Sequence, residues 1–318
     1  MTLQLSAPAG QDSSTGSLPR RGARRSPLHR GDALWAYLLI GPTAIGLTVF
    51  SLWPAIQTFY FSFTTWGTFG GHEWTGADNY AQVIQDPELL RSLLNTVIFT
   101  VMTLVGIPLS IVLAALLNTR GLRGVSIYRT LYFLPVVTLP AAVALVWKLL
   151  YNGDFGLVNW ALGLVGIHGG HWLSDSSTAI YAVGVVSIWS SLGYNMVLFL
   201  AGMQSIPPEY YEAASIDGAG RIRQFLQITV PLLTPTTFFV TVITVINSLQ
   251  AFDLIYLMVG KDSPAIPASE TVVYLFYSKG ILQGQGGYAA AIAFVLLALI
   301  LLVTLFQFRM QRRWVHYV

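Results

Sequence analysis

Six long stretches of mostly apolar residues dominate the sequence and limit what it can fold into. An α-helix needs about 20 apolar residues to cross the hydrocarbon core of a bilayer. Only 10% of the chain is charged, against roughly 25% in soluble domains, so an ordinary soluble protein is excluded. We predict an all-α membrane protein with six transmembrane helices. The expected spans are Ala33–Trp53, Leu93–Leu117, Leu131–Leu150, Ala179–Met203, Leu232–Val259 and Tyr288–Phe308.

The distribution of Lys and Arg predicts the orientation of these spans. Basic residues are retained on the cytoplasmic side of a membrane. Of the 17 in the chain, 13 lie in the N-terminal tail, in the segments after spans two and four, and in the C-terminal tail. We therefore expect a multi-pass protein of the plasma (inner) membrane with both termini in the cytoplasm. The expected organisation is a disordered Arg-rich tail (1–32), a six-helix transmembrane domain (33–308) and a short cytoplasmic tail (309–318).

Two features describe the ends of the chain and its outer loops. No cleavable secretory signal precedes the first span, which is expected to remain as an anchor. Between spans one and two, Asp86-Pro87-Glu88 is typical of a helix start, with Asp as the N-cap and Pro in the first turn. We expect a short amphipathic helix there, leading into span two. The outer loops, including 151–177, could offer a docking surface to an external protein.

Motifs for enzyme chemistry are missing from the chain. It has no cysteine, which excludes disulfides and thiol nucleophiles. It has neither a P-loop nor a Gly-x-Ser-x-Gly nucleophile motif. His168 and His171 could share a metal, but no third ligand is apparent, and loop polarity is the better interpretation. We expect no catalytic residue, metal or cofactor in this chain. The net charge of only +3 reflects membrane topology and does not indicate a nucleic-acid partner.

The loop between spans four and five is the most informative segment. Pro207-Pro208 ends span four and can begin a new helix, with a carboxylate of Glu209 in its first turn. Asp217-Gly218 is a stop signal, because glycine suits the left-handed position after a helix. A second short helix is expected from Ala219 to Ile228, ending before Pro231. The pattern predicts a helix–turn–helix elbow in the cytoplasm. Its first helix should carry Glu209, Glu212, Ala213 and Ile216 on one face.

This loop resembles the loop motif of permease subunits of binding-protein-dependent ABC importers. That motif is Glu-Ala-Ala, three residues, Gly, nine residues and Ile-x-Leu-Pro. The chain has Glu212-Ala213-Ala214, Gly218, Ile228 and Pro231 at this spacing, with Val230 where Leu is usual. The form Asp217-Gly218-Ala219 is similar to the carbohydrate branch of the family.

The likeness covers nearly everything after the N-terminal tail. The contexts of Asn79-Tyr80 and Asn95-Thr96 resemble the first permease of maltose, glycerol-phosphate and other sugar importers. The chain departs from the family at Gly260-Lys261-Asp262-Ser263-Pro264, where Gly-Gly-Pro is common. That departure points to a partner or substrate preference of its own at the outer lip.

The resemblance implies a set of partners and a coupling contact. In the family, the first helix of the loop docks into a cleft of an ATPase subunit, which uses ATP and Mg. The resemblance further implies a second permease subunit, an ATPase dimer, an extracytoplasmic binding protein and a sugar or polyol substrate. The residues expected at or beside the ATPase contact are Glu209, Glu212, Ala213, Ala214, Asp217, Gly218 and Arg221.

Polar and aromatic groups in two spans are candidates for lining the substrate path. In span five, Asn247, Gln250 and Asp253 are three apart, which would place them on one face of a helix. Amides can satisfy sugar hydroxyls, and an aromatic ring can stack on a sugar. Interhelix hydrogen bonds and an interfacial aromatic belt remain the alternative. The candidates in span four are Trp189, Tyr194 and Asn195.

Other functions remain open at this stage. A secondary transporter working alone would show inverted repeats and buried ion-binding groups, and we find no internal repeat. A membrane scaffold for an external protein would need no polar stripe in span five. Within the importer class, amino-acid or peptide import is an alternative to sugar. The scarcity of basic residues in the spans favours a neutral sugar over a phosphorylated polyol.

Overall fold

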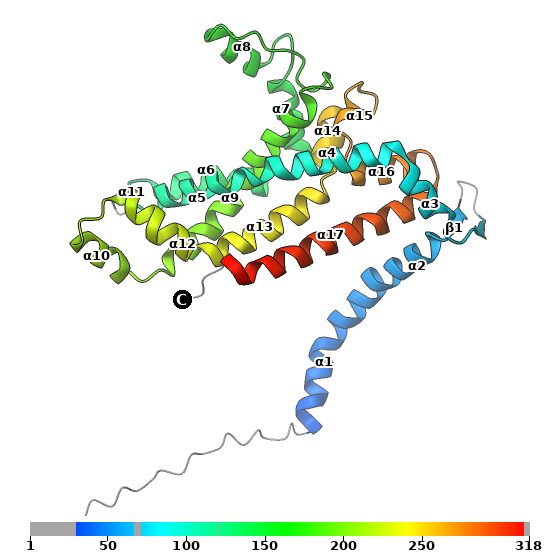
Figure 1. Cartoon of the computed structure of the whole chain (residues 1–318), viewed down its shortest axis with the longest axis horizontal. Coiled ribbons are helices and arrows are strands. Elements are labelled where there is room, and N and C mark those ends of the chain that lie inside the picture. Colours follow the sequence, from blue (N-terminus) through cyan, green and yellow to red (C-terminus); the bar gives the residue numbers. More distant parts are fainter. Residues whose placement is uncertain (1–29, 67–70, 120, 315–318) are drawn as a thin grey trace, which may run out of the picture. The chain divides into compact units, whose positions relative to one another are not determined.

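A computed structural model of the chain describes residues 30–66, 71–119 and 121–314. These residues are helical apart from a two-stranded hairpin and connecting loops (Figure 1). Four helices are long and apolar enough to cross a membrane, and two bent pairs raise the number of candidate spans to as many as six. Residues 1–29 of the expected tail, and 315–318 at the other end, lie outside the described residues.

The chain divides into two compact units, and the first ends at Ala55. Its described part consists of α1 (Arg30–Leu47), a π-helical turn (Thr48–Leu52) and the start of α2 (Trp53–Phe61). Large apolar side chains such as Leu39 and Phe50 are exposed there. A helix that is apolar all round is suited to a lipid environment. The candidate span covers Tyr37–Phe61, so it ends eight residues beyond the expected Trp53.

The second unit begins at Ile56 and contains the remaining elements. A short antiparallel hairpin, β1 (Thr64–Trp66) and β2 (His72–Trp74), precedes the first of its helices. The helices are α3 (Asp78–Gln85), α4 (Pro87–Leu104), α5 (Gly106–Leu117), α6 (Val125–Val137), α7 (Pro140–Leu150), α8 (Leu157–Leu164), α9 (Ala179–Gln204), α10 (Glu209–Ile216), α11 (Arg221–Gln224), α12 (Val230–Leu232), α13 (Thr234–Leu249), α14 (Asp253–Val259), α15 (Ile266–Ser269), α16 (Val272–Tyr277) and α17 (Gly286–Trp314). Two further π-helical turns cover Phe225–Thr229 and Ser278–Leu282.

The start of α4 confirms the expected cap. Asp86 Oδ1 accepts a hydrogen bond from the backbone N–H of Glu88 at 2.8 Å, and Pro87 occupies the first turn. The helix that begins here is long, because α4 and α5 together form one candidate span, Pro87–Leu117. The short amphipathic helix is therefore α3, one element earlier than expected.

Two pairs of helices, Val125–Val137 with Pro140–Leu150 and Arg221–Leu232 with Thr234–Leu249, are sharply bent where they join. The join between α6 and α7 turns the chain by 102°. Pro135 lies inside α6 and Pro140 opens α7, and a proline forces the residue before it toward extended backbone. Leu139 accordingly has φ −58° and ψ 134°. The join between α12 and α13 is bent by 65°.

The prediction of span five as one continuous helix over Leu232–Val259 is wrong. The helix α13 ends at Leu249, and α14 begins only at Asp253. No proline or glycine lies in this break. A tertiary contact accompanies it, since the backbone oxygen of Ala251 accepts a hydrogen bond of 2.6 Å from Thr271 Oγ1. Spans four and six agree closely with expectation, since they correspond to α9 and to residues 286–312 of α17.

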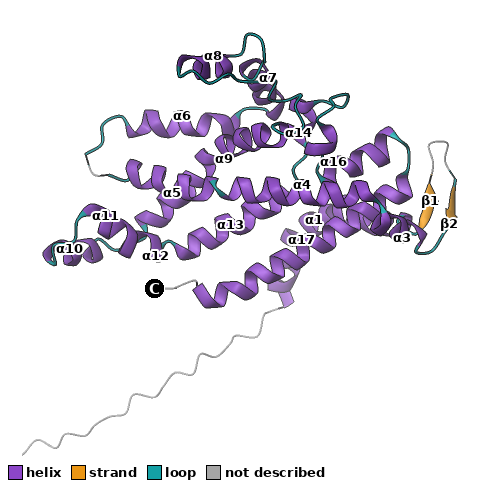
Figure 2. Ribbon diagram, turned by 45° about the horizontal axis from the view of Figure 1, so that its top comes forward, coloured by secondary structure: helices purple, strands orange, loops and turns teal. Residues whose placement is uncertain are grey.

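Helix α9 lies against several other helices of the second unit, including α5, α6 and α4 (Figure 2). The contact with α6 is close because a Cβ at Gly193 would lie 2.0 Å from the backbone oxygen of Tyr132. Only glycine permits that approach. On another side of the bundle, Thr103 of α4 and Ser248 of α13 join through their hydroxyls at 2.6 Å. The buried core therefore contains fixed polar ties as well as apolar packing.

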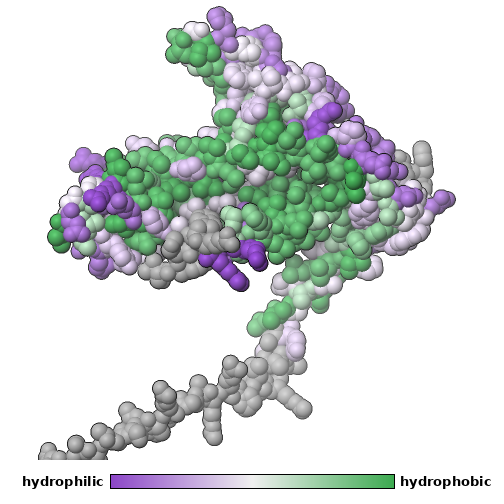
Figure 3. Space-filling view, in the orientation of Figure 1, coloured by the Kyte–Doolittle hydropathy of each residue, from purple (hydrophilic) through white to green (hydrophobic). Residues whose placement is uncertain are grey.

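The surface of the second unit separates into zones of different hydropathy (Figure 3). Hydrophilic residues gather over α10 and α11 at one end and around α3 and the hairpin at the other, with a hydrophobic surface between them. Helices α4 and α17 carry exposed large apolar side chains, among them Leu94, Val101 and Leu305. Such a band is suited to contact with lipid tails or with another apolar helix bundle.

Candidate functional site

A cavity of about 440 Å³ lies between two of the joins at which helices are interrupted. Its walls come from the join between α6 and α7, from the join between α13 and α14, and from α4 and α9. Discontinuous helices free backbone and side-chain polar groups from regular pairing, and transporters place binding sites at such breaks. The cavity is therefore the first candidate for a solute site.

Five of the six residues predicted for a solute path line this cavity: Tyr194, Asn195, Asn247, Gln250 and Asp253. Asn195 is only 4% exposed. Within the described residues, its side-chain amide makes no hydrogen bond. The hydroxyl of Ser190, another lining residue, is buried without a hydrogen-bond partner among the described residues, and an unsatisfied buried polar group costs about 1–3 kcal/mol. Water or a polar solute in the cavity would remove that cost.

The geometry that brings these groups together differs from the expected helical stripe. Asn247 belongs to α13, Gln250 follows its last residue, and Asp253 begins α14. The three residues therefore do not form one helical face, and they share the cavity because the chain turns between them. Trp189 is not a lining residue. Its ring packs against the ring of Trp147, with centroids 5.5 Å apart.

The sequence interpretation missed part of the lining. Phe252 borders the cavity and stacks on Tyr256, with ring centroids 5.2 Å apart. A group of hydroxyls was missed as well. The signal was present in Pro135 and Pro140, because proline-interrupted apolar segments point to binding sites in transporters. The missed hydroxyl residues are Thr103, Thr138, Ser187, Ser190, Ser191, Thr244 and Ser248.

The elbow after α9 is a helix–turn–helix, as the loop pattern predicts. Gly218 has φ +75°, and two hydrogen bonds close the end of α10. One runs from Gly218 N to the Ser215 oxygen at 3.1 Å, the other from Ala219 N to the Ala214 oxygen at 2.8 Å. This pair is the Schellman arrangement that glycine makes accessible. Gln224 Nε2 adds a bond of 2.9 Å to the Ala219 oxygen.

The second helix of the elbow does not stop before Pro231. It continues from α11 through a π-helical turn, Phe225–Thr229, into α12. Proline has no N–H to donate. The wider turn pairs Val230 N with the Phe225 oxygen, five residues back, just before Pro231.

The outward face of α10 carries the predicted residues. Glu209, Glu212 and Ala213 are exposed together with Ile216, which is 88% exposed. Ala214 is half-buried. Tyr211 turns inward, and its hydroxyl lies 3.0 Å from Thr229 Oγ1. The remaining predicted residues of the elbow, Asp217, Gly218 and Arg221, are exposed.

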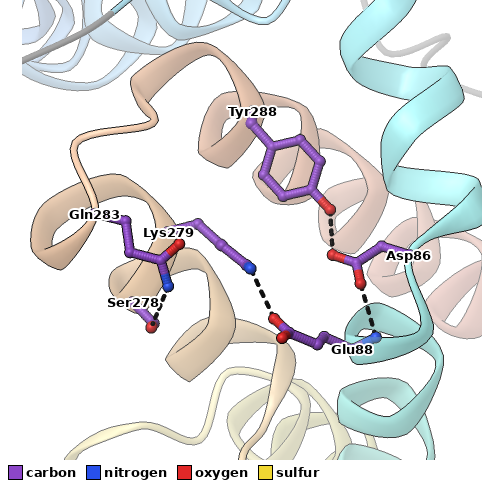
Figure 4. Close-up of polar contacts among 6 residues, drawn as sticks. All are labelled: Asp86, Glu88, Ser278, Lys279, Gln283 and Tyr288. Atoms are coloured by element: carbon purple, nitrogen blue, oxygen red, sulfur yellow. Dashed lines mark hydrogen bonds and ion pairs between the residues drawn. The ribbon is translucent and has the colours of Figure 1, made fainter.

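A polar cluster ties α4 to the start of α17 at the opposite end of the second unit (Figure 4). Lys279 Nζ lies 2.7 Å from Glu88 Oε2, and the Tyr288 hydroxyl donates to Asp86. Glu270 lies close by, outside the candidate spans. Burial raises the pKa of Glu270 to about 7, with a further contribution from the negative charge of Glu88. This cluster holds together segments that are far apart in the sequence.

No group of three potential metal ligands occurs among residues 30–66, 71–119 and 121–314. His171 packs closely over Gly153, where a Cβ would lie 2.1 Å from its Nδ1. Asn159 of α8 donates from Nδ2 to the backbone oxygens of Gly153 at 2.9 Å and Gly170 at 3.1 Å, on either side of this helix. The histidine loop is thus organised by an asparagine.

Comparison with known proteins agrees with this architecture. Residues 88–316 match the family described as binding-protein-dependent transport system inner membrane component. The chain belongs to this family. It is an ABC importer permease, a multi-pass inner-membrane subunit, and it is not the subunit that hydrolyses nucleotide.

The curated relatives extend over nearly the whole permease. This permease is 37% identical to the sn-glycerol-3-phosphate transport system permease protein UgpA of Agrobacterium fabrum, over 88% of this chain and 96% of that protein. It is 34% identical to the probable ABC transporter permease protein YesP of Bacillus subtilis, over 92% and 96% of the two chains.

A solved structure supports the same fold. A chain of a bacterial ABC transporter involved in the import of the acidic polysaccharide alginate is 25% identical. It superposes with a TM-score of 0.78, covering 90% of this permease and 97% of that chain.

Proposed function

We propose that this permease forms, with a second permease subunit, the alternating-access path for a sugar or related polyol. An extracytoplasmic binding protein delivers the solute, and a dimer of a partner ATPase supplies the energy from ATP and Mg. In this proposal each bent pair of helices counts as one span, which makes six, and both termini lie in the cytoplasm. The observation that carries the proposal is the cavity at the two helix breaks, lined by amides that have no hydrogen-bond partner among the described residues.

The relatives support the class of solute. The names of the Agrobacterium and Yersinia proteins specify sn-glycerol-3-phosphate, a polyol derivative. The alginate transporter has also been solved in complex with its periplasmic protein carrying an alginate pentasaccharide. A polyhydroxylated solute is common to both.

The lining of the cavity has the chemistry that such a solute needs. The amides of Asn195, Asn247 and Gln250 each offer both donors and acceptors, and hydroxyls surround them. The ring of Phe252 offers an apolar face at the same place. Ligand sites of this kind combine apolar walls with a few polar groups that fix orientation.

The elbow supports a contact with the ATPase. Its exposed face combines the carboxylates of Glu209 and Glu212 with the apolar side chain of Ile216. Next to α10, a shallow groove is lined by Ile222, Leu226 and their neighbours. Ile222 is 77% exposed in this chain. Charged and apolar groups together at one projecting turn fit the cleft of a partner protein.

The elbow follows α9 with only Pro207-Pro208 and flanking residues between them, and α9 lines the cavity. We propose that closure of the ATPase dimer moves α10 and thereby α9 and its neighbours. The cavity then opens alternately to the two sides of the membrane. This is a rigid-body transition, and it requires no covalent intermediate.

The coupling contact is tested by co-purification of the detergent-solubilised permease from its own membranes. Gly218→Asp places a charged side chain on the elbow. Its surroundings are open, since a Cβ added there would meet no atom within 4 Å, and Asp is among the residues that tolerate the left-handed backbone. We expect wild type to bring down an ATPase and a second permease, and Gly218→Asp to lose the ATPase.

The matched control is Gly166→Asp in the loop after α8. Gly166 has φ +77° and equally open surroundings, so it carries the same backbone strain far from the elbow in the sequence. It should retain the ATPase. If wild type brings down no nucleotide-hydrolysing partner, or if both variants lose it equally, the coupling proposal fails.

A further inference from the structure

We infer that Asp253 makes the cavity selective against anions, so that the solute of this permease is an uncharged polyhydroxy compound. The inference rests on the proposed function, because it assumes that the solute passes through this cavity. The role that it gives to Asp253 does not follow from the substrates of the named relatives.

The cavity lining carries negative charge and no positive charge among the described residues. Among the described residues that line the cavity, Asp253 is the only one with a charged side chain, and none is Lys, Arg or His. The other polar groups are the amides of Asn195, Asn247 and Gln250, and hydroxyls. Asp253 stands in the first turn of α14, where the peptide dipoles favour a negative charge.

An anionic solute would meet the wrong chemistry here. Phosphates and carboxylates are bound by cationic side chains, above all by the planar fork of arginine. The N-terminus of α7 also borders the cavity at Pro140, but its dipole corresponds to only about half an elementary charge. The carboxylate of Asp253 therefore dominates. This contrasts with relatives named for sn-glycerol-3-phosphate and for an acidic polysaccharide.

A cationic solute is not the better match. A single carboxylate surrounded by neutral amides gives one charged contact, whereas the lining offers many groups that pair with hydroxyls. A sugar hydroxyl can donate to the Asp253 carboxylate in a charge-assisted hydrogen bond. The same solute can accept from the amide of Asn195. Asp253 is thus proposed as a specificity-determining residue for uncharged polyols.

Thiol labelling measures the electrostatic potential in the cavity, and the experiment does not require the solute to be known. The chain has no cysteine, so Asn247→Cys gives a unique site, and labelling of this chain is read from its mass in the whole importer complex. The probes are two methanethiosulfonates, one with a trimethylammonium group and one with a sulfonate. Each rate is divided by the rate with a free thiol. Any effect of Asp253 on the reactivity of the thiol itself cancels in the ratio of the two probes.

We expect the cationic probe to be favoured at the thiol introduced by Asn247→Cys. The ratio should fall about fivefold or more when Asp253→Asn is added, as expected for two unit charges at short range. Asp253→Glu should retain the ratio, which separates charge from disturbed packing. The control position is Ile281→Cys, which is exposed and outside the cavity lining. There, Asp253→Asn should leave the ratio unchanged.

The outcomes separate this inference from the proposed function. If both probes label the Asn247→Cys variant but Asp253→Asn leaves their ratio unchanged, the charge selectivity is overturned while the cavity stays open to solutes. If neither probe labels that variant, with or without ATP, the cavity is not a solute path, and both proposals fall.

Discussion

Asn95 of α4 donates a hydrogen bond from Nδ2 to the backbone oxygen of Glu270, 3.0 Å away and 175 positions later in the sequence. The same amide donates to the oxygen of Pro267 at 3.1 Å. Its neighbour Thr96 accepts a bond of 3.1 Å from the N–H of Val272. Two consecutive side chains of α4 therefore hold the segment that joins α15 to α16.

Replacing Asn95 should weaken this tie. Asn95→Leu removes both donors and leaves two backbone oxygens without their partner, so we expect the free energy of unfolding to fall by about 2–3 kcal/mol. Thermal unfolding of the purified importer in detergent measures the change. The control is Asn118→Leu, at the exposed end of α5. Equal losses in the two variants would contradict a specific role for Asn95.

Gly193 should tolerate no side chain. Gly193→Ala would place a methyl group 2.0 Å from the backbone oxygen of Tyr132, and a backbone atom in a helix pair moves only if α6 and α9 separate. Overpacking of this kind costs about 1–3 kcal/mol or more. We expect a lower melting temperature or a failure to assemble. Gly163→Ala in α8, which has open surroundings, should leave assembly intact, and a harmless Gly193→Ala would disprove the close contact.

Glu270 should make the stability of the permease depend on pH. Burial raises the pKa of Glu270 to about 7 in the folded protein, above its ordinary value of 4.5. The folded state therefore retains a proton that the unfolded chain has lost, and stability falls as pH rises from about 4.5 to about 7. Glu270→Gln should flatten this decline in melting curves recorded from pH 5 to 8. The exposed Glu73→Gln should not flatten it.

Two neighbours should shift the same transition in opposite directions. The positive charge of Lys279 lowers the pKa of Glu270, and the negative charge of Glu88 raises it. Lys279→Met should therefore extend the loss of stability to higher pH, whereas Glu88→Gln should end it at lower pH. The readout is the midpoint of the pH dependence rather than the absolute stability, since the ion pair itself is worth at most about 1 kcal/mol at a surface. Shifts in the same direction would rule out an electrostatic cause.

The parts of the fold that depend on local chemistry follow from the sequence. Helix α9 begins at the predicted Ala179, and no proline or charged residue interrupts its mostly apolar run. The turn at Gly218 follows from the need for a left-handed residue after α10. These features need only hydropathy and backbone preference, which neighbouring residues determine.

The parts that depend on distant contacts do not follow. The break between Leu249 and Asp253 has no proline or glycine, and it is tied to Thr271, twenty residues beyond Ala251. For this reason the polar residues of span five line one cavity in a geometry other than the expected helical face. Phe252 lies within this break and lines the cavity, and the expectation of one continuous helix did not single it out.

The glycine contact between α9 and α6 has a mechanical consequence. Helix α9 leads into the elbow through paired prolines, and Gly193 seats it against α6, which ends at the 102° bend beside the cavity. Both helices are continuous between these points. A displacement of the elbow would therefore be transmitted through α9 to the bend beside the cavity. Inserting a flexible segment into α9 would uncouple the two ends while leaving each of them folded.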